Sequence, residues 1–521
     1  MRKTTPVNIL LLIMAFATIL WSQQAEKELS LDDCIVGALK NNLGLAVEVF
    51  NPQLADISVT QAKERFVPSL VLGYDKQETN QPSFSWIEAG DQVQEQFMDY
   101  YGQFTQEIPF GGNFQITLYS YETETTARFQ TINPRFGSQL RFDFTQPLLK
   151  NFGLKISQRE IVIAKNNAAI SEIQLKQTLL DTIYNVEEAY WNYVGSIEYH
   201  KVMQQSLELA RDLLARNTRE VEVGLIAPIE VLSAKAEVAR READILQAES
   251  MIKGSQDRLK TILNLSVRED IDLTKIVPTD TPTDEEKEVS LEEALAMGLQ
   301  MRPDLQAIRA DLKNRDFDLS YAKNQLLPEL NFQASLWSPG LSGTQLIYEN
   351  DNPLTGNIIG SIPGNSSDAL RDALKFKYKN WTFGLTLSIP FTSVITRAQY
   401  AQAKVSLQQA QVNLENQEQQ AFLEIRNAVR DVETSYKQVQ AYRLARELAL
   451  ENLEAEQKKL KVGLTTNYDV LLRQRDLADA RSSELRSVIT YNLALAALDR
   501  ALGATLEKKN IKLADIWGMA D

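Results

Sequence analysis

Two stretches of the sequence share one pattern: Val223-Gly224-Leu225-Ile226-Ala227-Pro228-Ile229-Glu230-Val231-Leu232 and Val462-Gly463-Leu464-Thr465-Thr466-Asn467-Tyr468-Asp469-Val470-Leu471. In each, a long helical segment stops, turns within a few residues, and a new helical segment starts. Gly224 and Gly463 suit the left-handed conformation just past a helix end, which glycine adopts without steric penalty. Pro228 suits the first turn of a new helix, where its missing N–H costs nothing. Thr466 with Asp469 three residues later has the pattern of an N-cap and its capping box.

These stretches belong to a tandem duplication that covers nearly the whole chain. A slide of 260 residues pairs Ser30-Leu31 with Ser290-Leu291 and Pro68 with Pro328. A slide of 239 residues pairs Val223-Gly224-Leu225 with Val462-Gly463-Leu464. Because the two offsets differ by 21, the first copy carries 21 extra residues between Pro68 and Ala164. We place the first repeat at residues 23–284 and the second at residues 285–521.

Each repeat opens with helical sequence. Ser30-Leu31-Asp32-Asp33 predicts a capped helix that runs to about Asn42. Asn51-Pro52 disfavours a helix, so Leu43 to Phe50 is expected to be a short extended piece, with a second helix from Pro52 to just before Pro68. In the second repeat the corresponding helices are predicted over residues 290–327.

After Pro68 and Pro328 the pattern changes to alternation, which predicts strands over about residues 69–147 and 330–389. Gln139 to Gln146 alternates strictly, with Leu140, Phe142 and Phe144 on one face, and Trp381 to Ile389 does the same. Each is close to the roughly 9–11 residues of a tilted strand in a membrane barrel. An apolar face and a polar face fit lipid outside and water inside, but an ordinary half-buried sheet explains the pattern equally well.

The extra residues of the first copy predict an added hairpin, with strands at Tyr101 to Glu107 and Phe114 to Thr126 and a turn at Pro109-Phe110-Gly111-Gly112. This hairpin (101–126) either adds two barrel strands or forms a flap beside the barrel. The second copy instead has a segment rich in Gly, Asn, Ser and Pro from Ser338 to about Lys377, which is typical of a surface loop.

The longest elements are two predicted helices over residues 156–223 and 392–461. A helix of this length would extend roughly 100 Å. A series of residues in the second copy follows alternating steps of four and three: Ala421, Ile425, Ala428, Val432, Ser435, Val439 and Tyr442. This heptad spacing indicates that the helices supercoil against partners. Return helices are predicted over 228–264 and 466–503.

The N-terminus has the pattern of an export signal. Arg2 and Lys3 precede an apolar run from Ile9 to Leu20, so residues 1–22 are interpreted as a secretory signal peptide that is cut after Ser22, with Ala25 as the second choice. The formal net charge of −14 becomes −16 once Arg2 and Lys3 are removed. An acidic balance argues against a nucleic-acid partner, which requires clustered Lys and Arg.

The residues that carry most enzyme chemistry are scarce. The chain has one histidine, His200, and one cysteine, Cys34, which lies among apolar helix positions and is expected to be buried. No His or Cys cluster has metal-ligand spacing, and Gly111-Gly112 lacks the Lys of a phosphate-binding loop. We therefore expect no enzymatic activity, no metal and no cofactor.

The order of these elements closely resembles the TolC-like outer membrane efflux protein family from about Leu29 to Ala504. Three further motifs carry the resemblance: Gln146-Pro147-Leu148, Ile389-Pro390-Phe391 and Ala501-Leu502-Gly503. It implies a mainly α fold with membrane β-strands, in which a homotrimer forms one duct. Each chain would give strands to a shared β-barrel in the outer membrane of a Gram-negative bacterium and coiled-coil helices to a shared α-barrel in the periplasm.

The resemblance also implies the partners and the site residues. A periplasmic adaptor protein would dock on the tip formed by Val223, Gly224, Leu225, Val462, Gly463 and Leu464, and an inner-membrane pump would drive efflux or type I secretion. Some members narrow the entrance with acidic residues just after the turn, which correspond here to Glu230 and Asp469. This sequence departs from the fuller pattern, because Leu472 stands where some members have a second acid and Thr465 where some have Arg.

Two alternatives stay open at the level of the sequence. Glu230 and Asp469 could simply cap a first helical turn and compensate its dipole. The whole chain could instead be a soluble periplasmic coiled-coil scaffold with a small sheet. Ducts of this type pass drugs, metal ions and polypeptides, so the resemblance leaves the cargo open.

Overall fold

The structure, a computed structural model, describes residues 26–84, 90–265 and 275–511. The predicted signal peptide at residues 1–22 lies outside this part of the chain. The chain forms two compact units. Unit 1 comprises residues 1–53, 170–309 and 413–521, and unit 2 comprises residues 54–169 and 310–412. The divisions fall within four helices: α3 (Leu43–Glu64), α5 (Arg159–Glu222), α8 (Pro303–Gln325) and α10 (Val394–Lys461).

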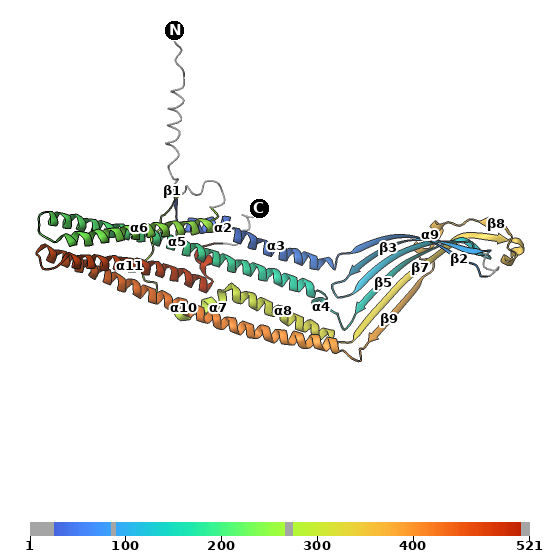
Figure 1. The fold of residues 1–521 in the computed structure, drawn as a ribbon. Coiled ribbons are helices and arrows are strands. Elements are labelled where there is room, and N and C mark those ends of the chain that lie inside the picture. The colour runs from blue at the N-terminus through green and yellow to red at the C-terminus, as the bar shows by residue number, and fades with distance from the viewer. Residues whose placement is uncertain (1–25, 85–89, 266–274, 512–521) are drawn as a thin grey trace, which may run out of the picture. The chain divides into compact units, whose positions relative to one another are not determined.

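Unit 1 contains two helical hairpins, in which α5 is followed by α6 (Pro228–Ile262) and α10 by α11 (Asn467–Leu502) (Figure 1). The long helix expected over 156–223 begins later, because a short helix, α4 (Leu154–Ser157), precedes α5 and Gln158 separates the two. The helix expected over 392–461 begins at Val394. The second return helix ends where Gly503 adopts a left-handed φ of 70°, as a glycine C-cap requires.

Each hairpin is covered by a short capped helix of its own repeat. These helices are α2 (Leu31–Asn41) and α7 (Leu291–Met301). The Ser30 hydroxyl accepts the N–H of Asp33 and the Asp33 carboxylate accepts the N–H of Ser30, so the predicted capping box is present. Two short strands that were not predicted, β1 (Glu26–Leu29) and β6 (Lys275–Pro278), pair in parallel, and a single-turn helix, α12 (Thr505–Lys508), follows α11.

The duplication produces two separate hydrophobic cores in unit 1. Side chains of β1, α2, α3, α5, α6 and β6, together with Ile489 of α11, build the first core, and side chains of α7, α10 and α11 build the second. Cys34 is fully buried in the first core, as expected. The predicted heptad positions Ile425, Val432 and Val439 of α10 are buried in the second core, together with residues of α11. The repeats therefore use the same packing twice.

One acid lies inside the first core. Glu187 of α5 is 7% exposed, and the nearest cation is Lys509, whose Nζ lies 3.8 Å from Glu187 Oε1. Burial raises the pKa of Glu187 to about 7, against a partial opposing effect of Lys509. The carboxyl is therefore held largely in its neutral form in the folded protein only below about pH 7.

Unit 2 contains one antiparallel sheet. Its six long strands are hydrogen-bonded in the order β2 (Ser69–Pro82), β3 (Gln92–Glu107), β4 (Asn113–Thr125), β5 (Ile132–Pro147), β7 (Glu329–Tyr348), β9 (Asn380–Ser388). A short strand, β8 (Ile358–Ile362), pairs with the last part of β7. Within the described residues, the outer edges of β2 and β9 have no strand partner.

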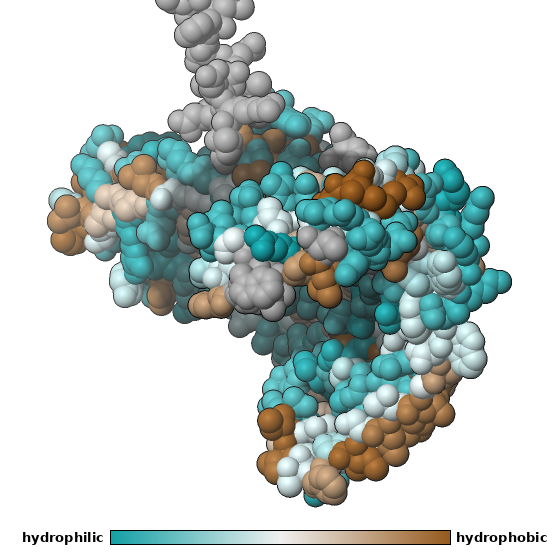
Figure 2. Space-filling view, turned by 90° about the vertical axis from the view of Figure 1, so that its right-hand side faces the viewer, coloured by the Kyte–Doolittle hydropathy of each residue, from teal (hydrophilic) through white to brown (hydrophobic). Residues whose placement is uncertain are grey.

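The register gives the sheet one apolar and one polar face. One row of cross-strand neighbours defines the apolar face: Leu70, Phe104, Ile116, Phe142, Leu336 and Trp381. An adjacent row defines the polar face: Ser69, Thr105, Gln115, Asp143, Ser335 and Thr382. Trp381 and Leu70 of the apolar face are two-thirds exposed, and Figure 2 shows hydrophobic side chains gathered in bands beside polar ones. This chain alone leaves the apolar face largely uncovered.

The extra hairpin of the first copy belongs to the sheet. β3 and β4 lie between β2 and β5 with continuous pairing on both sides, so the hairpin adds two strands and is not a flap. β3 is also longer than predicted, because it begins at Gln92 instead of Tyr101.

The expectation of an extended piece at Leu43 to Phe50 was wrong. α3 runs through this segment with Pro52 inside it. The Asn42 side chain accepts the N–H of Leu45 at 3.0 Å, which starts the helix at Leu43. One interior proline removes a single backbone hydrogen bond, and the burial of Leu45 and Val49 in the first core stabilises the helical turns that precede it.

The loop expected from Ser338 to Lys377 was also wrong in large part. β7 continues to Tyr348 because β5 offers it hydrogen-bond partners as far as Gln345. A helix, α9 (Ser366–Leu374), then packs on β5 and β7. Gly340 is needed at this contact, since a Cβ there would collide with the backbone oxygen of Ala369.

Replacing Glu187 by Gln tests the buried acid. An unfolded Glu has a pKa of about 4.5, whereas the folded carboxyl keeps its proton to about pH 7. Between these values the folded state binds the extra proton, so stability falls as pH rises through this window. E187Q removes that loss, and we expect it to stabilise the protein at pH 8 by on the order of 1–3 kcal/mol, with little effect at pH 5.

Thermal melts followed by circular dichroism at both pH values measure this difference. The matched control is Glu188→Gln, which removes the surface ion pair of Glu188 with Arg258 and should change stability by a similar small amount at both pH values. A lower melting temperature for E187Q at pH 8 would show that Glu187 is ionised and paired with Lys509.

Candidate functional site

The turn after α5 closes the helix with a Schellman motif. The N–H of Leu225 donates to the carbonyl of Glu220 at 2.8 Å, and the N–H of Gly224 donates to that of Val221 at 2.9 Å. Gly224 has a φ of 78°, as predicted for the left-handed position. Pro228 then occupies the first turn of α6.

The turn after α10 repeats this geometry. The N–H of Leu464 donates to the carbonyl of Lys459, that of Gly463 donates to Leu460, and both distances are 3.0 Å. Gly463 has a φ of 75°. The apolar side chains beside the glycines point into solvent, with exposed fractions of 69% for Val223, 74% for Leu225, 69% for Val462 and 77% for Leu464.

Both turns lie at the same end of unit 1 (Figure 1). A small core joins the two hairpins near the turns. Leu213 of α5, Leu453 of α10 and Leu471 of α11 are among its buried residues. The Gln474 side chain of α11 also donates to the backbone oxygen of Leu209 in α5 at 3.3 Å. The two predicted turns thus lie at one end of unit 1, beyond a core that joins their hairpins.

A buried charge cluster links the two return helices. Glu237 of α6, whose side chain is 4% exposed, accepts from Arg241 Nε at 3.0 Å and from Arg475 Nε of α11 at 3.1 Å. Burial opposes ionisation of Glu237, but the hydrogen bond from Arg475 and the charge of Arg241 outweigh it and hold the pKa of the carboxyl below its ordinary value. Glu237 is therefore a charged connection between α6 and α11.

Asp469 is held in the predicted capping box. Its Oδ2 atom accepts from the Thr466 hydroxyl at 2.5 Å and the Thr466 N–H at 3.2 Å, and lies 3.1 Å from the Thr465 hydroxyl. The side chain and backbone of Thr466, followed by Thr465, hold the pKa of Asp469 below its ordinary value. The carboxylate is consequently ionised at neutral pH and fixed in direction, while Oδ1 is free of these contacts.

The other acids of the tip have different surroundings. Glu230 lies in the first turn of α6 and is partly exposed. Glu456 of α10, which sequence reasoning missed, accepts from the same Thr465 hydroxyl that contacts Asp469. Thr465 thus brings two carboxylates together at the second turn. Glu456 precedes the turn in sequence, whereas the family pattern concerns acidic residues after the glycine.

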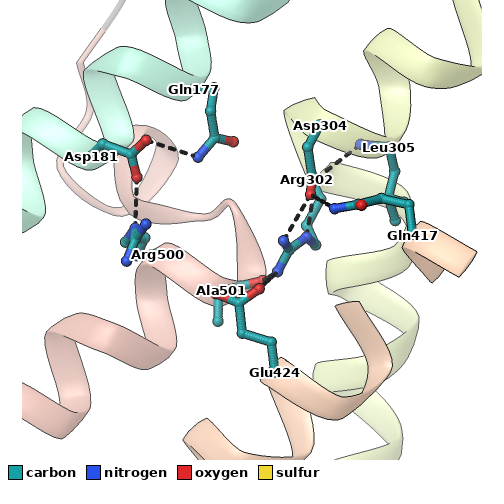
Figure 3. Close-up of polar contacts among 9 residues, drawn as sticks. All are labelled: Gln177, Asp181, Arg302, Asp304, Leu305, Gln417, Glu424, Arg500 and Ala501. Carbon is teal, nitrogen blue, oxygen red and sulfur yellow. Dashed lines mark hydrogen bonds and ion pairs between the residues drawn. The ribbon is translucent and has the colours of Figure 1, made fainter. Parts of the chain in front are cut away.

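A second missed cluster holds the corner between α7 and α8 (Figure 3). Arg302 donates to both carboxylate oxygens of Asp304, at 3.0 and 2.8 Å, to Glu424 of α10 at 2.7 Å, and to the backbone oxygen of Ala501 at 3.1 Å. Gln417 of α10 donates to Asp304 as well. The Arg302-Pro303-Asp304 sequence indicates the corner. Its partners lie more than a hundred residues away in the chain, so residue spacing could not predict them. The cluster fixes α8 against α10 and α11.

The two residues with the most reactive side chains are poorly placed for chemistry. Burial raises the pKa of the Cys34 thiol to about 12, so it remains protonated and is a weak nucleophile. His200 lies in mid-helix with Nε2 3.9 Å from Glu249. Among the residues that the structure describes, no three His, Cys, Asp or Glu side chains are grouped to hold a metal ion.

None of the described helices combines the length and apolarity that crossing a membrane requires. The surfaces that stand out are the exposed tip of unit 1 and the two-faced sheet of unit 2.

Comparison with known proteins places this architecture in a family. The family model for outer membrane efflux proteins matches residues 152–265 and 295–504, which is more than half of the chain. The outer membrane protein TolC of Escherichia coli is 23% identical over 359 residues, 68% of either chain. TolC of Vibrio cholerae is 23% identical over 369 residues, 69% of this chain and 76% of its own.

A solved structure agrees on the fold. The CmeC outer membrane channel of Campylobacter jejuni matches with a TM-score of 0.62 at 15% identity, over 93% of this chain and 90% of its own. These relatives are channel proteins rather than enzymes. The chain is an outer-membrane efflux channel protein and belongs to the outer membrane efflux protein family.

Proposed function

We propose that three copies of this chain form one continuous exit duct that an inner-membrane pump uses through a periplasmic adaptor. The observation that carries the proposal is the sheet of unit 2, which has an uncovered apolar face and open edges at β2 and β9. In hydrocarbon, unpaired backbone groups find no water, so a sheet edge must be closed. Pairing β9 of one copy with β2 of the next closes every edge.

The size of the barrel follows from the strand count. Each chain supplies six long strands, so three copies would close a barrel of eighteen. The second repeat supplies two of the six, β7 and β9, and the added β3–β4 hairpin accounts for two of the four in the first repeat. Because barrel diameter grows with strand number, this hairpin widens the pore by half over a barrel built from two strands per repeat. The polar face, with Asp143, Ser335 and Thr382, would line the lumen.

The helices of unit 1 also have faces that require a partner. On α10, Leu423, Leu444 and Leu448 are half-exposed or more. Their spacing of 21 and 4 residues places them on one side of the helix in heptad register. On α6, Ile229, Leu232 and Leu246 are similarly exposed. Neighbouring copies would cover these seams in an α-barrel.

The tip supplies the docking surface of the proposal. Val223, Leu225, Val462 and Leu464 are large apolar residues in solvent, and three copies would present six such turns in a ring. Exposed apolar clusters of this kind mark protein interfaces. Asp469, charged and fixed by its cap, and Glu230 would narrow the entrance inside this ring.

The assembly is tested by the mass and location of the protein. We expect outer-membrane fractions to contain it, and light scattering in detergent to give three times the mass of the mature chain. Reconstituted trimers should conduct ions. Release of a monomer by osmotic shock would support the periplasmic scaffold instead and reject the duct.

The docking surface is tested by placing a large side chain at each turn. Gly463→Trp or Gly224→Trp should abolish export while leaving trimers intact, because a left-handed non-glycine residue costs only about 1–2 kcal/mol but the large ring blocks the partner. The matched control is Gly463→Asn, since Asn tolerates the left-handed conformation and stays small. Export by the Trp variants at the wild-type rate would remove the turns from the docking surface.

The gate is tested by single-channel recording. Asp469→Ala removes three carboxylates from the proposed entrance, and we expect conductance to rise and block by divalent cations to weaken by about tenfold or more. Asp33→Ala is the control, because Asp33 forms the same capping box in α2. If both variants leave conductance and block unchanged, Asp469 acts only as a helix cap.

A further inference from the structure

The apolar face of the sheet carries one element that the duct does not explain. α9 packs over β5 and β7, with Ala369 and Ala373 fully buried. Gly340, against which Ala369 packs, has the same strand parity as Leu336 and therefore lies on the apolar face. Phe376, just after α9, stacks on Phe142 of that face with ring centroids 6.0 Å apart. In the proposed barrel, on which this inference rests, α9 lies outside, toward lipid.

The height of α9 matches the outer boundary of the membrane. From Glu329, where β7 starts, to Gly340 the strand advances eleven residues, or roughly 36 Å along its axis. At a tilt of about 45°, this is roughly 26 Å along the membrane normal, close to the apolar band of about 25 Å in such barrels. Tyr74 and Tyr100 lie in the same row of cross-strand neighbours as Gly340, as expected for aromatic residues at an interface.

A groove on the apolar face lies beside the segment that follows this helix. It has a volume of about 450 Å³, and its lining includes Phe114, Phe142, Leu336, Trp381 and Phe383. Phe142 belongs both to the groove and to the stack with Phe376. In the proposed barrel the groove therefore opens toward the membrane interior and extends to the residue that contacts the segment after α9.

Three lysines lie in the segment between α9 and β9, next to the groove. The segment that connects α9 to β9 reads Lys375-Phe376-Lys377-Tyr378-Lys379. Lys377 pairs with Asp372 at 2.6 Å, and Arg371 pairs with Asp368 at 3.2 Å, which neutralises both acids of α9. Lys375 and Lys379 are exposed and make no ion pair within the described part of the chain. Two positive charges are thus left for a ligand.

We propose that this groove and the two lysines form a binding site for an anionic lipid of the outer leaflet. An acyl chain would lie between Phe142, Leu336 and Phe383, and the phosphate of the headgroup would lie on Lys375 and Lys379. Basic clusters at the membrane surface attract anionic headgroups, and an aromatic-lined groove of this volume is within the range of ligand sites. The lipid covers an apolar surface that α9 leaves open and fixes the depth of the barrel.

Native mass spectrometry of the detergent-solubilised trimer tests the site. The probes are dioleoyl phosphatidylglycerol and dioleoyl phosphatidylcholine, which share acyl chains and differ in net charge. We expect up to one phosphatidylglycerol per chain at concentrations where phosphatidylcholine is lost. Lys375→Gln with Lys379→Gln should weaken phosphatidylglycerol binding by roughly thirtyfold, whereas Lys404→Gln with Lys458→Gln, which removes two exposed lysines of α10, should leave it unchanged.

Two further measurements separate the possible sources of failure. Ala334→Trp fills the groove and should abolish binding even with both lysines present, while millimolar inorganic phosphate should not displace the lipid. Equal retention of the two lipids, unchanged binding by the double lysine variant, or displacement by free phosphate would overturn the proposal. The unaltered protein and each variant are also tested for trimers and conductance, since their absence in the unaltered protein would refute the duct and not the lipid site alone.

Discussion

An open sheet edge in hydrocarbon is the constraint on which the rest of the architecture depends. The backbone groups of a membrane strand must be paired, because nothing in the lipid interior can replace water. Within the part of the chain that the structure describes, β2 and β9 each leave one edge unpaired, and the row from Leu70 to Trp381 belongs to an apolar face that is covered only near α9. The described elements of one chain satisfy neither the edges nor the face. The same copies that close the barrel would cover Leu444 and Leu448 on α10, so one assembly step would satisfy both units.

The duplication preserved backbone geometry more faithfully than side chains. Both turns close with the same pair of hydrogen bonds around a glycine near φ 75°, yet the helix that follows starts with Pro228 in one copy and with the Thr466–Asp469 capping box in the other. These are two solutions to the same problem of unsatisfied N–H groups at a helix start. Only the second places a fixed charge at the turn. In a trimer the six turns would therefore alternate between two chemistries, so an adaptor would meet two kinds of site on a ring of similar shape.

Features that depend on residues close in sequence were predicted correctly. The caps at Ser30 and Thr466 and the left-handed glycines depend on neighbours within a few residues, and the sequence was sufficient for them. Pro52 was misread because tertiary burial of Leu45 and Val49 outweighs one lost hydrogen bond. The part of β7 beyond Ser338 was wrongly predicted to be a loop because of its glycines. These glycines make room for a helix packed on the sheet and for a partner strand two hundred residues earlier in the chain. The clusters around Arg302 and Glu237 depend on partners from other helices, which periodicity cannot locate.

In the proposed duct, the connection between Glu237 and Arg475 would limit how the entrance widens. α11 carries Asp469, so moving this carboxylate outward would move α11. Arg475 of α11 donates to Glu237 of α6, and a hydrogen bond between charged groups contributes about 1.5–3 kcal/mol. Separating α11 from α6 would remove this stabilisation. It would also leave the buried carboxylate of Glu237, 4% exposed, with Arg241 as its remaining partner. Moving the two return helices together preserves the contact. In the proposed duct, the opening of lowest cost would therefore shift α6 and α11 as a pair.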